Sequence, residues 1–168
     1  MLLETVEDLL VDQLRDLYST ETQIEVALPL AVDQAAAPAV REALSAEFET
    51  TERQIGRLQE VFGALGVSAR GPRCLGIAGL LQEMEDAMRR ADRGPLLDAV
   101  ALAGLRRALS YQITCYRLAL EYARQVGQER ITLLLSQSLA EDSAAEAVLA
   151  ELALREALAP ATQAALAS

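Results

Sequence analysis

Acidic and amide side chains stand where uninterrupted apolar stripes are expected, and Glu21 is the clearest case. Over residues 6–28, apolar side chains recur every three or four positions, the spacing of one helix face, and Glu21 falls on that face. A carboxylate buried there must be paired, hydrogen-bonded, protonated or bound to a metal, because burying a bare charge is costly. Glu21 therefore predicts that other polar groups meet it inside the protein.

Three more stretches with helical apolar spacing carry polar residues near their middle: Glu47, Thr51 and Gln54 within 38–65, Gln112 within 96–126, and Glu141, Asp142 and Glu146 within 129–158. If four such helices pack together, these side chains and Glu21 form one polar layer inside a bundle. The candidate metal ligands are the carboxylates Glu21, Glu47, Glu141, Asp142 and Glu146. The uncharged members of the layer are Thr51, Gln54 and Gln112.

A carboxylate layer inside a four-helix bundle is typical of dinuclear metal sites, in which two helices each supply a Glu and two each supply a Glu-x-x-His pair. The sequence contains no histidine, so it has no such pair. Its oxygen ligands suit a hard cation such as Mn²⁺, Mg²⁺ or Ca²⁺ and are poorly suited to oxygen-activating iron. Two alternatives remain open: a metal-free hydrogen-bonded cluster that fixes helix register, and an arrangement in which some of these residues face solvent.

Other catalytic chemistry finds little support. Without histidine, the serine, threonine and cysteine residues cannot form the usual nucleophile–base pairs. Cys74 and Cys115 have no Cys-x-x-Cys spacing and are too few for a disulfide framework, which favours a reducing compartment. Cys115, within a buried helix, is expected to fill space as a small apolar side chain.

The elements that position the polar layer follow from the same periodicity. We expect long helices over residues 4–33, 38–65, 96–126 and 129–158, and a shorter one over 77–90. Pro29 is expected to kink the first helix without ending it, and Gly66 to cap the second. This order predicts an all-α, ferritin-like antiparallel four-helix bundle with an additional short crossing helix. Residues 1–160 are expected to form this single domain, and 161–168 a frayed C-terminal tail.

Composition narrows the range of partners. The 168 residues are 52% hydrophobic and carry a net charge of −10, which argues against disorder, nucleic acid and anionic membrane surfaces. The chain has no basic leader and no uncharged apolar run of about 18 residues, so a cytoplasmic protein is expected. The stretch 96–126 is apolar on most faces and is expected to be central or shared with a second subunit, which predicts a homodimer.

Two segments resemble the YciE/YciF-type family of ferritin-like proteins. The first is Asp-Gln-Leu-Arg-Asp-Leu-Tyr-Ser-Thr-Glu-Thr-Gln at 12–23, followed by Ala-Leu-Pro at 27–29; the second is Glu-Thr-Thr-Glu-Arg-Gln-Ile-Gly-Arg-Leu at 49–58. Weaker similarity is found at Cys74 and at Tyr111 with Tyr116. The resemblance implies a bacterial cytosolic stress-associated protein, a dimeric bundle and, in many members, a dinuclear metal layer with acidic and histidine ligands.

The chain departs from that family at the metal layer. Glu47 stands where members typically carry a histidine, and Thr50 stands where they carry a glutamate. The Glu-His-Tyr-Glu stretch of the family is Leu-Ser-Tyr-Gln here, at 109–112, so three potential ligands are lost together. We therefore predict a degenerate member without a cofactor and without catalysis, which serves as a structural protein or binds a protein partner. The alternative is a carboxylate-bound Mn or Fe protein with an oxidase, peroxide-detoxifying or metal-storage role.

Overall fold

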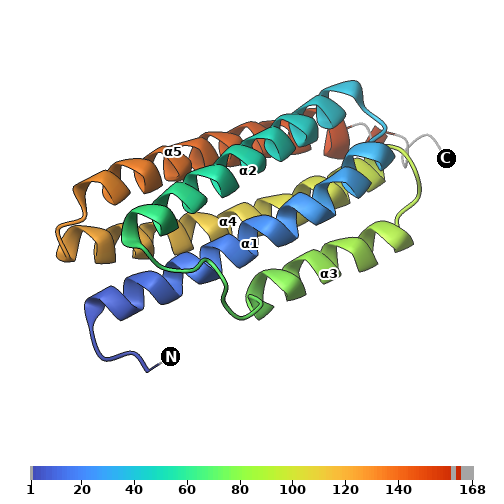
Figure 1. Cartoon of the computed structure of the whole chain (residues 1–168). Helices are drawn as coiled ribbons and strands as arrows, with labels where there is room; N and C mark the ends of the chain where they lie inside the picture. Colours follow the sequence, from blue (N-terminus) through green and yellow to red (C-terminus); the bar gives the residue numbers. More distant parts are fainter. Residues whose placement is uncertain (1, 160–161, 164–168) are drawn as a thin grey trace.

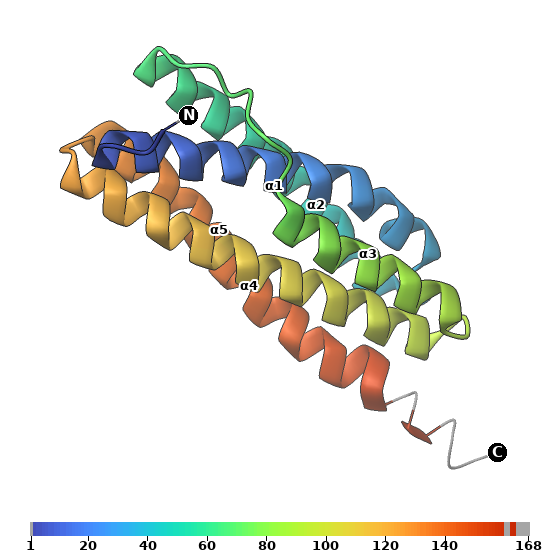
Figure 2. The ribbon, with the colours of Figure 1, turned by 90° about the horizontal axis from the view of Figure 1, so that it is seen from below.

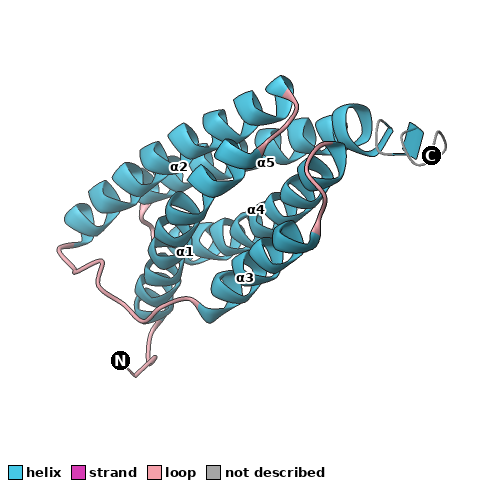
Figure 3. Ribbon diagram, turned by 90° about the vertical axis from the view of Figure 1, so that its right-hand side faces the viewer, coloured by secondary structure: helices cyan, strands magenta, loops and turns pink. Residues whose placement is uncertain are grey.

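Helices account for most of the computed structural model, which describes residues 2–159 and 162–163 (Figure 1). Those residues form no strand and five α-helices: α1 (Val6–Gln34), α2 (Pro38–Leu65), α3 (Leu75–Arg90), α4 (Pro95–Gln125) and α5 (Glu129–Leu152). A short π-helical segment, η1 (Ala153–Leu158), continues α5. The loops between the helices are short except for the one that joins α2 to α3 (Figure 3). The tail expected over 161–168 lies outside the described residues, apart from 162 and 163.

The ends of the first two helices follow from local sequence. Thr5 caps α1 by accepting a hydrogen bond from the Asp8 amide, while the Asp8 carboxylate accepts one from the Thr5 amide. As expected, α1 continues through Pro29, and Gly66 closes α2 with a left-handed φ of 66°. Each predicted helix among the first four therefore exists, with bounds that differ by at most two residues.

The last helix differs from the expectation of one α-helix over 129–158. The α-helical part ends at Leu152, and the chain widens into η1 over the next six residues. Ala153 and Ala157 are buried in this segment, which packs against α4. Because both side chains are small, the widened turn can lie close to α4 while keeping them on its inner side. Apolar spacing alone does not distinguish this winding from an α-helix.

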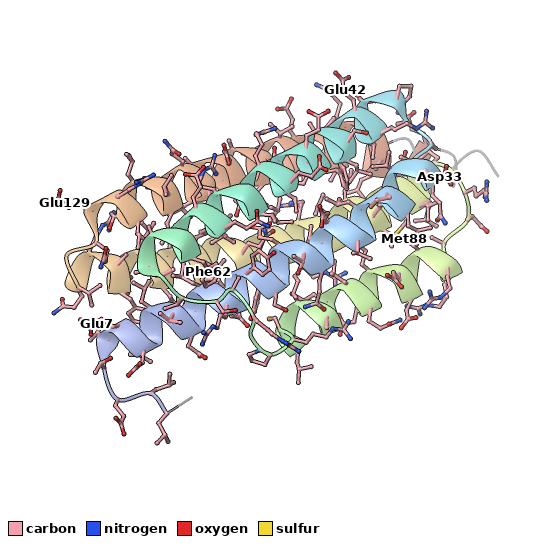
Figure 4. All side chains as sticks on the ribbon, in the orientation of Figure 1. Glu7, Asp33, Glu42, Phe62, Met88 and Glu129 are labelled. Atoms are coloured by element: carbon pink, nitrogen blue, oxygen red, sulfur yellow. The ribbon has the colours of Figure 1, made fainter. Side chains whose placement is uncertain are left out.

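The chain direction explains how four long helices share one bundle. Figure 4 marks its two ends, with Glu7, Phe62 and Glu129 at one end and Asp33, Glu42 and Met88 at the other. The connection through α3 returns the chain to the second end, so α4 runs parallel to α2 and antiparallel to α5 (Figure 1). This arrangement is the ferritin-like four-helix bundle with one long connection that the sequence predicts.

Helix α4 lies at the centre of the chain's own packing. It contacts α1, α3, α5 and η1, and α3 runs beside it along one half of the bundle (Figure 2). At Gly104, a Cβ atom would lie 2.2 Å from the Cγ atom of Met84, so the two helices approach closely there. The apolar character of 96–126 is therefore explained within one chain, and it no longer supports a dimer through this helix. Among the described helices, none combines the length and the hydropathy that crossing a membrane would require.

Asp98, buried on α4, holds the turn between α1 and α2. Its Oδ1 atom accepts a hydrogen bond from the Ala36 amide at 2.8 Å, and its Oδ2 atom accepts one from the Ala37 amide at 2.8 Å. Ala37 precedes the first residue of α2 and has no side chain that could cap the helix. A carboxylate from another helix therefore supplies the missing acceptors.

The hydrophobic core is divided into two clusters. One surrounds Ile24, Leu44, Leu109 and Leu149 near the turn between α1 and α2. The other surrounds Leu17, Leu58, Leu120 and Leu135 toward the opposite end. Along each of the four long helices, buried polar residues lie between these two clusters. The core thus places a polar layer at mid-height, where the sequence predicts it.

Candidate functional site

All four long helices contribute to the polar layer, and its fully buried members are Thr20, Glu21, Glu47, Thr51, Gln54, Gln112, Ser138 and Asp142. Glu21, Glu47, Thr51, Gln54, Gln112 and Asp142 are thus buried, as a position on the inner face of each helix requires. Burial of every one of these side chains means that their interactions are made with one another and with neighbouring side chains. Solvent screens them little.

Glu21 is bound by a tyrosine from α4. The Tyr116 hydroxyl donates a hydrogen bond to Glu21 Oε1 at 2.6 Å, and both side chains are fully buried. Burial, followed by the nearby charge of Asp142, raises the pKa of Glu21 well above its usual range, although Tyr116 and Gln112 oppose the shift. Burial in the layer therefore favours the neutral form of Glu21. Burial and the Glu21 charge also raise the pKa of Tyr116, so its phenol keeps its proton.

Asp142 is bound by an amide from α2. The Gln54 Nε2 atom donates to Asp142 Oδ1 at 2.6 Å. Burial raises the pKa of Asp142 to about 7 against the opposing effect of this hydrogen bond. Burial and then the charge of Asp142 raise the pKa of Glu47 to about 7 as well. At neutral pH the layer therefore carries only part of the charge that its three carboxyl groups could provide.

Two of the five predicted metal ligands form ion pairs with arginines, and one of them, Glu141, also accepts a hydrogen bond from Gln54 Nε2 at 3.3 Å. Arg57 forms two hydrogen bonds to Glu141, at 2.9 and 3.0 Å, at the edge of the layer. Burial raises the pKa of Glu141, but the hydrogen bonds and charge of Arg57 outweigh it and lower the pKa overall. Glu146 accepts hydrogen bonds from Arg106 at 2.9 and 2.7 Å. The structure therefore brings together Glu21, Glu47 and Asp142, and it places Glu141 and Glu146 in ion pairs.

Several atoms of the layer lack a partner. Among the described residues, the buried side-chain atoms without a hydrogen bond are Thr20 Oγ1, Glu21 Oε2, Glu47 Oε1, Thr51 Oγ1, Gln54 Oε1, Asp142 Oδ2 and both amide atoms of Gln112. An unsatisfied buried polar atom costs about 1–3 kcal/mol, and such atoms are rare in native proteins. Their concentration in one layer gives it the capacity to accept a small polar guest such as water or a cation.

The residues present do not fit a dinuclear centre with histidine ligands. The chain has no histidine, and α4 offers the neutral Gln112 to the layer. Arginines neutralise Glu141 and Glu146. Within the part of the chain that the structure describes, no group of three or more Cys, Asp or Glu side chains is placed to hold a metal ion. A single cation would require Glu21, Glu47 and Asp142 to turn their free oxygens toward one point.

Sequence reasoning missed two residues that matter to the layer. Tyr116 counts as apolar in a helical stripe, yet it lies four residues after Gln112 and therefore on the same face. Arg57 lies three residues after Gln54, and its Nη1 atom donates to Ser138 Oγ at 2.7 Å in addition to its contacts with Glu141. Spacing from residues already identified could have found both. The partner that each one contacts could not be read from the sequence.

Comparison with known proteins agrees with this fold. YciF of Escherichia coli (strain K12) is 26% identical over 155 residues, which cover 92% of this chain and 93% of YciF. The crystal structure of the E. coli stress protein YciF superposes with a TM-score of 0.86 over 90% of this chain and 96% of that one. YcfI of Rhodopseudomonas palustris superposes with a TM-score of 0.83 at 35% identity, over 87% of this chain and 93% of its own.

A family assignment rests on nearly the whole chain. The family described as "Domain of unknown function (DUF892)" matches residues 5–162, which include all five helices and η1. The match therefore covers every element that contributes to the polar layer. The chain is a member of the DUF892 family, to which its resemblance to YciF-type ferritin-like proteins also points.

Proposed function

We propose that this protein is a stress-associated bacterial member of its family, with a degenerate metal layer and a structural or partner-binding role without catalysis. Two relatives support the general role, since YciF is described as a stress protein and YcfI as a candidate structural protein. The proposal includes a cytoplasmic location, in which Cys74 and Cys115 stay reduced, and a homodimeric assembly.

One observation carries the proposal: Glu21 and Asp142 in the layer, and Glu141 at its edge, each accept a hydrogen bond from a side chain of another helix. Tyr116 binds Glu21, Gln54 binds Asp142, and Arg57 binds Glu141. These donors come from α4 and α2, so each contact fixes one helix against another. A hydrogen-bonded layer between two apolar clusters specifies the register of the helices, which is a structural role for buried polar groups.

Metal content tests this proposal. The protein is produced in medium supplemented with Fe, Mn and Zn, purified without chelator or affinity tag, and measured by elemental mass spectrometry. We expect less than about a tenth of an equivalent of metal per chain, and a melting temperature that is unchanged by chelator. One to two equivalents that are lost in Glu21→Ala, and retained in the exposed α1 variant Glu7→Ala, would contradict the proposal.

A second candidate function is favoured by the unpartnered oxygens of Glu21, Glu47 and Asp142. In this alternative they hold Mn or Fe, and the protein serves as an oxidase, as a peroxide-detoxifying protein or as a metal store. Oxygen ligands of this kind suit Mn²⁺. The alternative predicts that Mn²⁺ raises the melting temperature of the wild-type protein and has a smaller effect on Glu47→Gln. Absence of any shift at millimolar Mn²⁺ would exclude it.

A further inference from the structure

A second polar cluster lies apart from the layer, where α1, the start of α3 and α4 meet. Its members are Asp16, Cys74, Tyr111 and Cys115. The Cys74 Sγ atom is 3.1 Å from the Tyr111 hydroxyl, which donates a hydrogen bond to Asp16 Oδ2 at 3.2 Å. The Cys115 Sγ atom lies 3.7 Å from the same Asp16 oxygen. Both sulfur atoms therefore flank one hydroxyl–carboxylate pair.

Cys74 is also the residue through which α3 is attached to the bundle. Its amide donates to Ser19 Oγ at 2.9 Å, and its carbonyl accepts from Gln23 Nε2 at 3.1 Å. Two residues later, a Cβ atom at Gly76 would lie 3.0 Å from the Tyr111 ring. A change at the Cys74 sulfur therefore acts where α3 is seated on α1 and α4.

Both thiols are free and buried, and Cys74 directly follows an exposed loop. The loop that precedes Cys74 is exposed from Arg70 to Arg73. Ser19 and Gln23, which bind the Cys74 backbone, also line a surface hollow of about 350 Å³ beside that loop. Burial and then the Asp16 charge raise the pKa of the Cys115 thiol to about 12. The two thiols are about equally buried, with exposed fractions of 5% for Cys74 and 6% for Cys115, so what distinguishes Cys74 is its position directly after the exposed loop.

We propose that Cys74 and Cys115 form an oxidisable thiol pair, in which a hydroperoxide converts Cys74 to a sulfenic acid and Cys115 then closes a disulfide. In the first step the Cys74 sulfur takes one oxygen as the O–O bond breaks, and water leaves when the oxidant is hydrogen peroxide. In the second step the Cys115 sulfur attacks the Cys74 sulfur, the S–O bond breaks, and a second water leaves with the Cys115 proton. Two thiols and one peroxide thus give one disulfide and two waters.

The surrounding residues assist the second step. Asp16 Oδ2 accepts a hydrogen bond from the Cys115 thiol at 3.7 Å and so orients the proton that leaves with the second water. The Tyr111 hydroxyl must leave its place beside Cys74 for the sulfurs to meet. Cys74 lies at a loop–helix junction, so its backbone can move toward α4 with less disruption than a residue within a helix. The product would fasten the start of α3 covalently to α4.

The full-length reduced protein is treated with hydrogen peroxide, denatured, and alkylated with N-ethylmaleimide. We expect the free thiols to fall from two per chain to none, with an intact mass lower by two hydrogen atoms and a Cys74–Cys115 peptide on digestion. Dithiothreitol should restore both thiols. Three results would each overturn the proposal: two alkylated thiols after peroxide treatment, a disulfide between two chains, or an oxidised product that dithiothreitol does not reduce.

Single variants test the order of the two steps. In Cys115→Ser, Cys74 should stop at the sulfenic acid and react with dimedone, whereas in Cys74→Ser the Cys115 thiol should remain alkylatable after the same exposure. Circular dichroism confirms that each variant is folded, and the corresponding alanine variants replace any that are not. Dimedone labelling of Cys115 in the Cys74 variants would overturn the assignment of Cys74 as the first residue oxidised.

Discussion

Three carboxyl groups, those of Glu21, Glu47 and Asp142, share a layer from which water is largely excluded, and their protonation is therefore coupled to folding. Each has a raised pKa in the folded protein, with burial as the first cause. The unfolded chain releases these protons at a lower pH than the folded chain does. The folded state consequently binds more protons between the two pKa values, and its stability must fall as the pH rises through that interval.

The first prediction concerns Glu47. Its pKa rises from about 4.5 in the unfolded chain to about 7 in the folded one, so deprotonation across pH 5 to 8 removes about 3 kcal/mol of unfolding free energy. Glu47→Gln should be as stable as the wild type near pH 5 and more stable at pH 8. Urea unfolding followed by circular dichroism measures this difference. Glu49→Gln, at an exposed position of α2, is the control and should keep the wild-type slope.

The second prediction concerns the phenol that binds Glu21. Tyr116→Phe leaves Glu21 Oε1 buried without its donor and should lower the unfolding free energy by about 1–3 kcal/mol. Tyr122→Phe on the same helix removes a hydroxyl from a half-buried side chain and should change it little. Equal effects in urea unfolding would show that the Tyr116 hydroxyl does not stabilise the layer.

At the residue scale, helical periodicity predicts which side chains are buried but not which side chains they contact. Glu21 and Gln112 could be placed because one helical face sets the phase of every residue on it. Glu146 lies at the edge of its stripe and forms an ion pair with Arg106, a contact that helical spacing does not specify. The predicted role of the five carboxylates as metal ligands stays a prediction, and the metal measurement decides it.

At the scale of elements, the close approach of α3 and α4 depends on a missing side chain. The helix boundaries were predictable because proline, glycine and capping residues mark them locally. The contact between Gly104 and Met84 was not predictable, because a glycine within a helical pattern does not indicate which neighbour packs against it. The structure shows that this neighbour is Met84. The widening into η1 was missed for a similar reason, since it depends on packing against α4.

A matched pair of glycine variants tests this contact. Gly104→Ala would place a Cβ atom 2.2 Å from Met84 Cγ and 2.6 Å from Met84 Cβ, so α3 must shift, and we expect a loss of about 1–3 kcal/mol. Gly56→Ala lies in α2 with nothing within 4 Å of the new atom and should stabilise the protein by about 0.5–1 kcal/mol. Thermal unfolding compares the two. If Gly104→Ala is as stable as the wild type, α3 can move away from α4 at little cost in free energy.

At the scale of the molecule, one patch of exposed apolar side chains lies on α1. Val26 is 78% exposed and Leu30 is 44% exposed, one helical turn apart, so they share a face. A groove of about 480 Å³ between α1 and α2 adjoins this face and is lined in part by Pro29, Val32 and Phe48. We take this face of α1 as the contact in the proposed dimer because its exposed apolar side chains adjoin an apolar groove.

The assembly prediction follows from that surface. At micromolar concentration, light scattering should give the mass of a dimer, and Val26→Asp with Leu30→Asp should give the mass of a monomer because charges would be buried at the contact. Val148→Asp, at an exposed apolar position of α5, should leave the dimer intact. A monomeric wild-type protein would contradict the prediction.

The carboxylate of Asp98 has a consequence for the order in which the chain can fold. It satisfies the turn between α1 and α2 across a separation of 62 residues. While the protein is being synthesised, the first two helices emerge before Asp98 does, and the amides of Ala36 and Ala37 must remain hydrated until α4 arrives. The first hairpin is therefore completed by a residue from the second half of the chain, and the two halves reach their final form together.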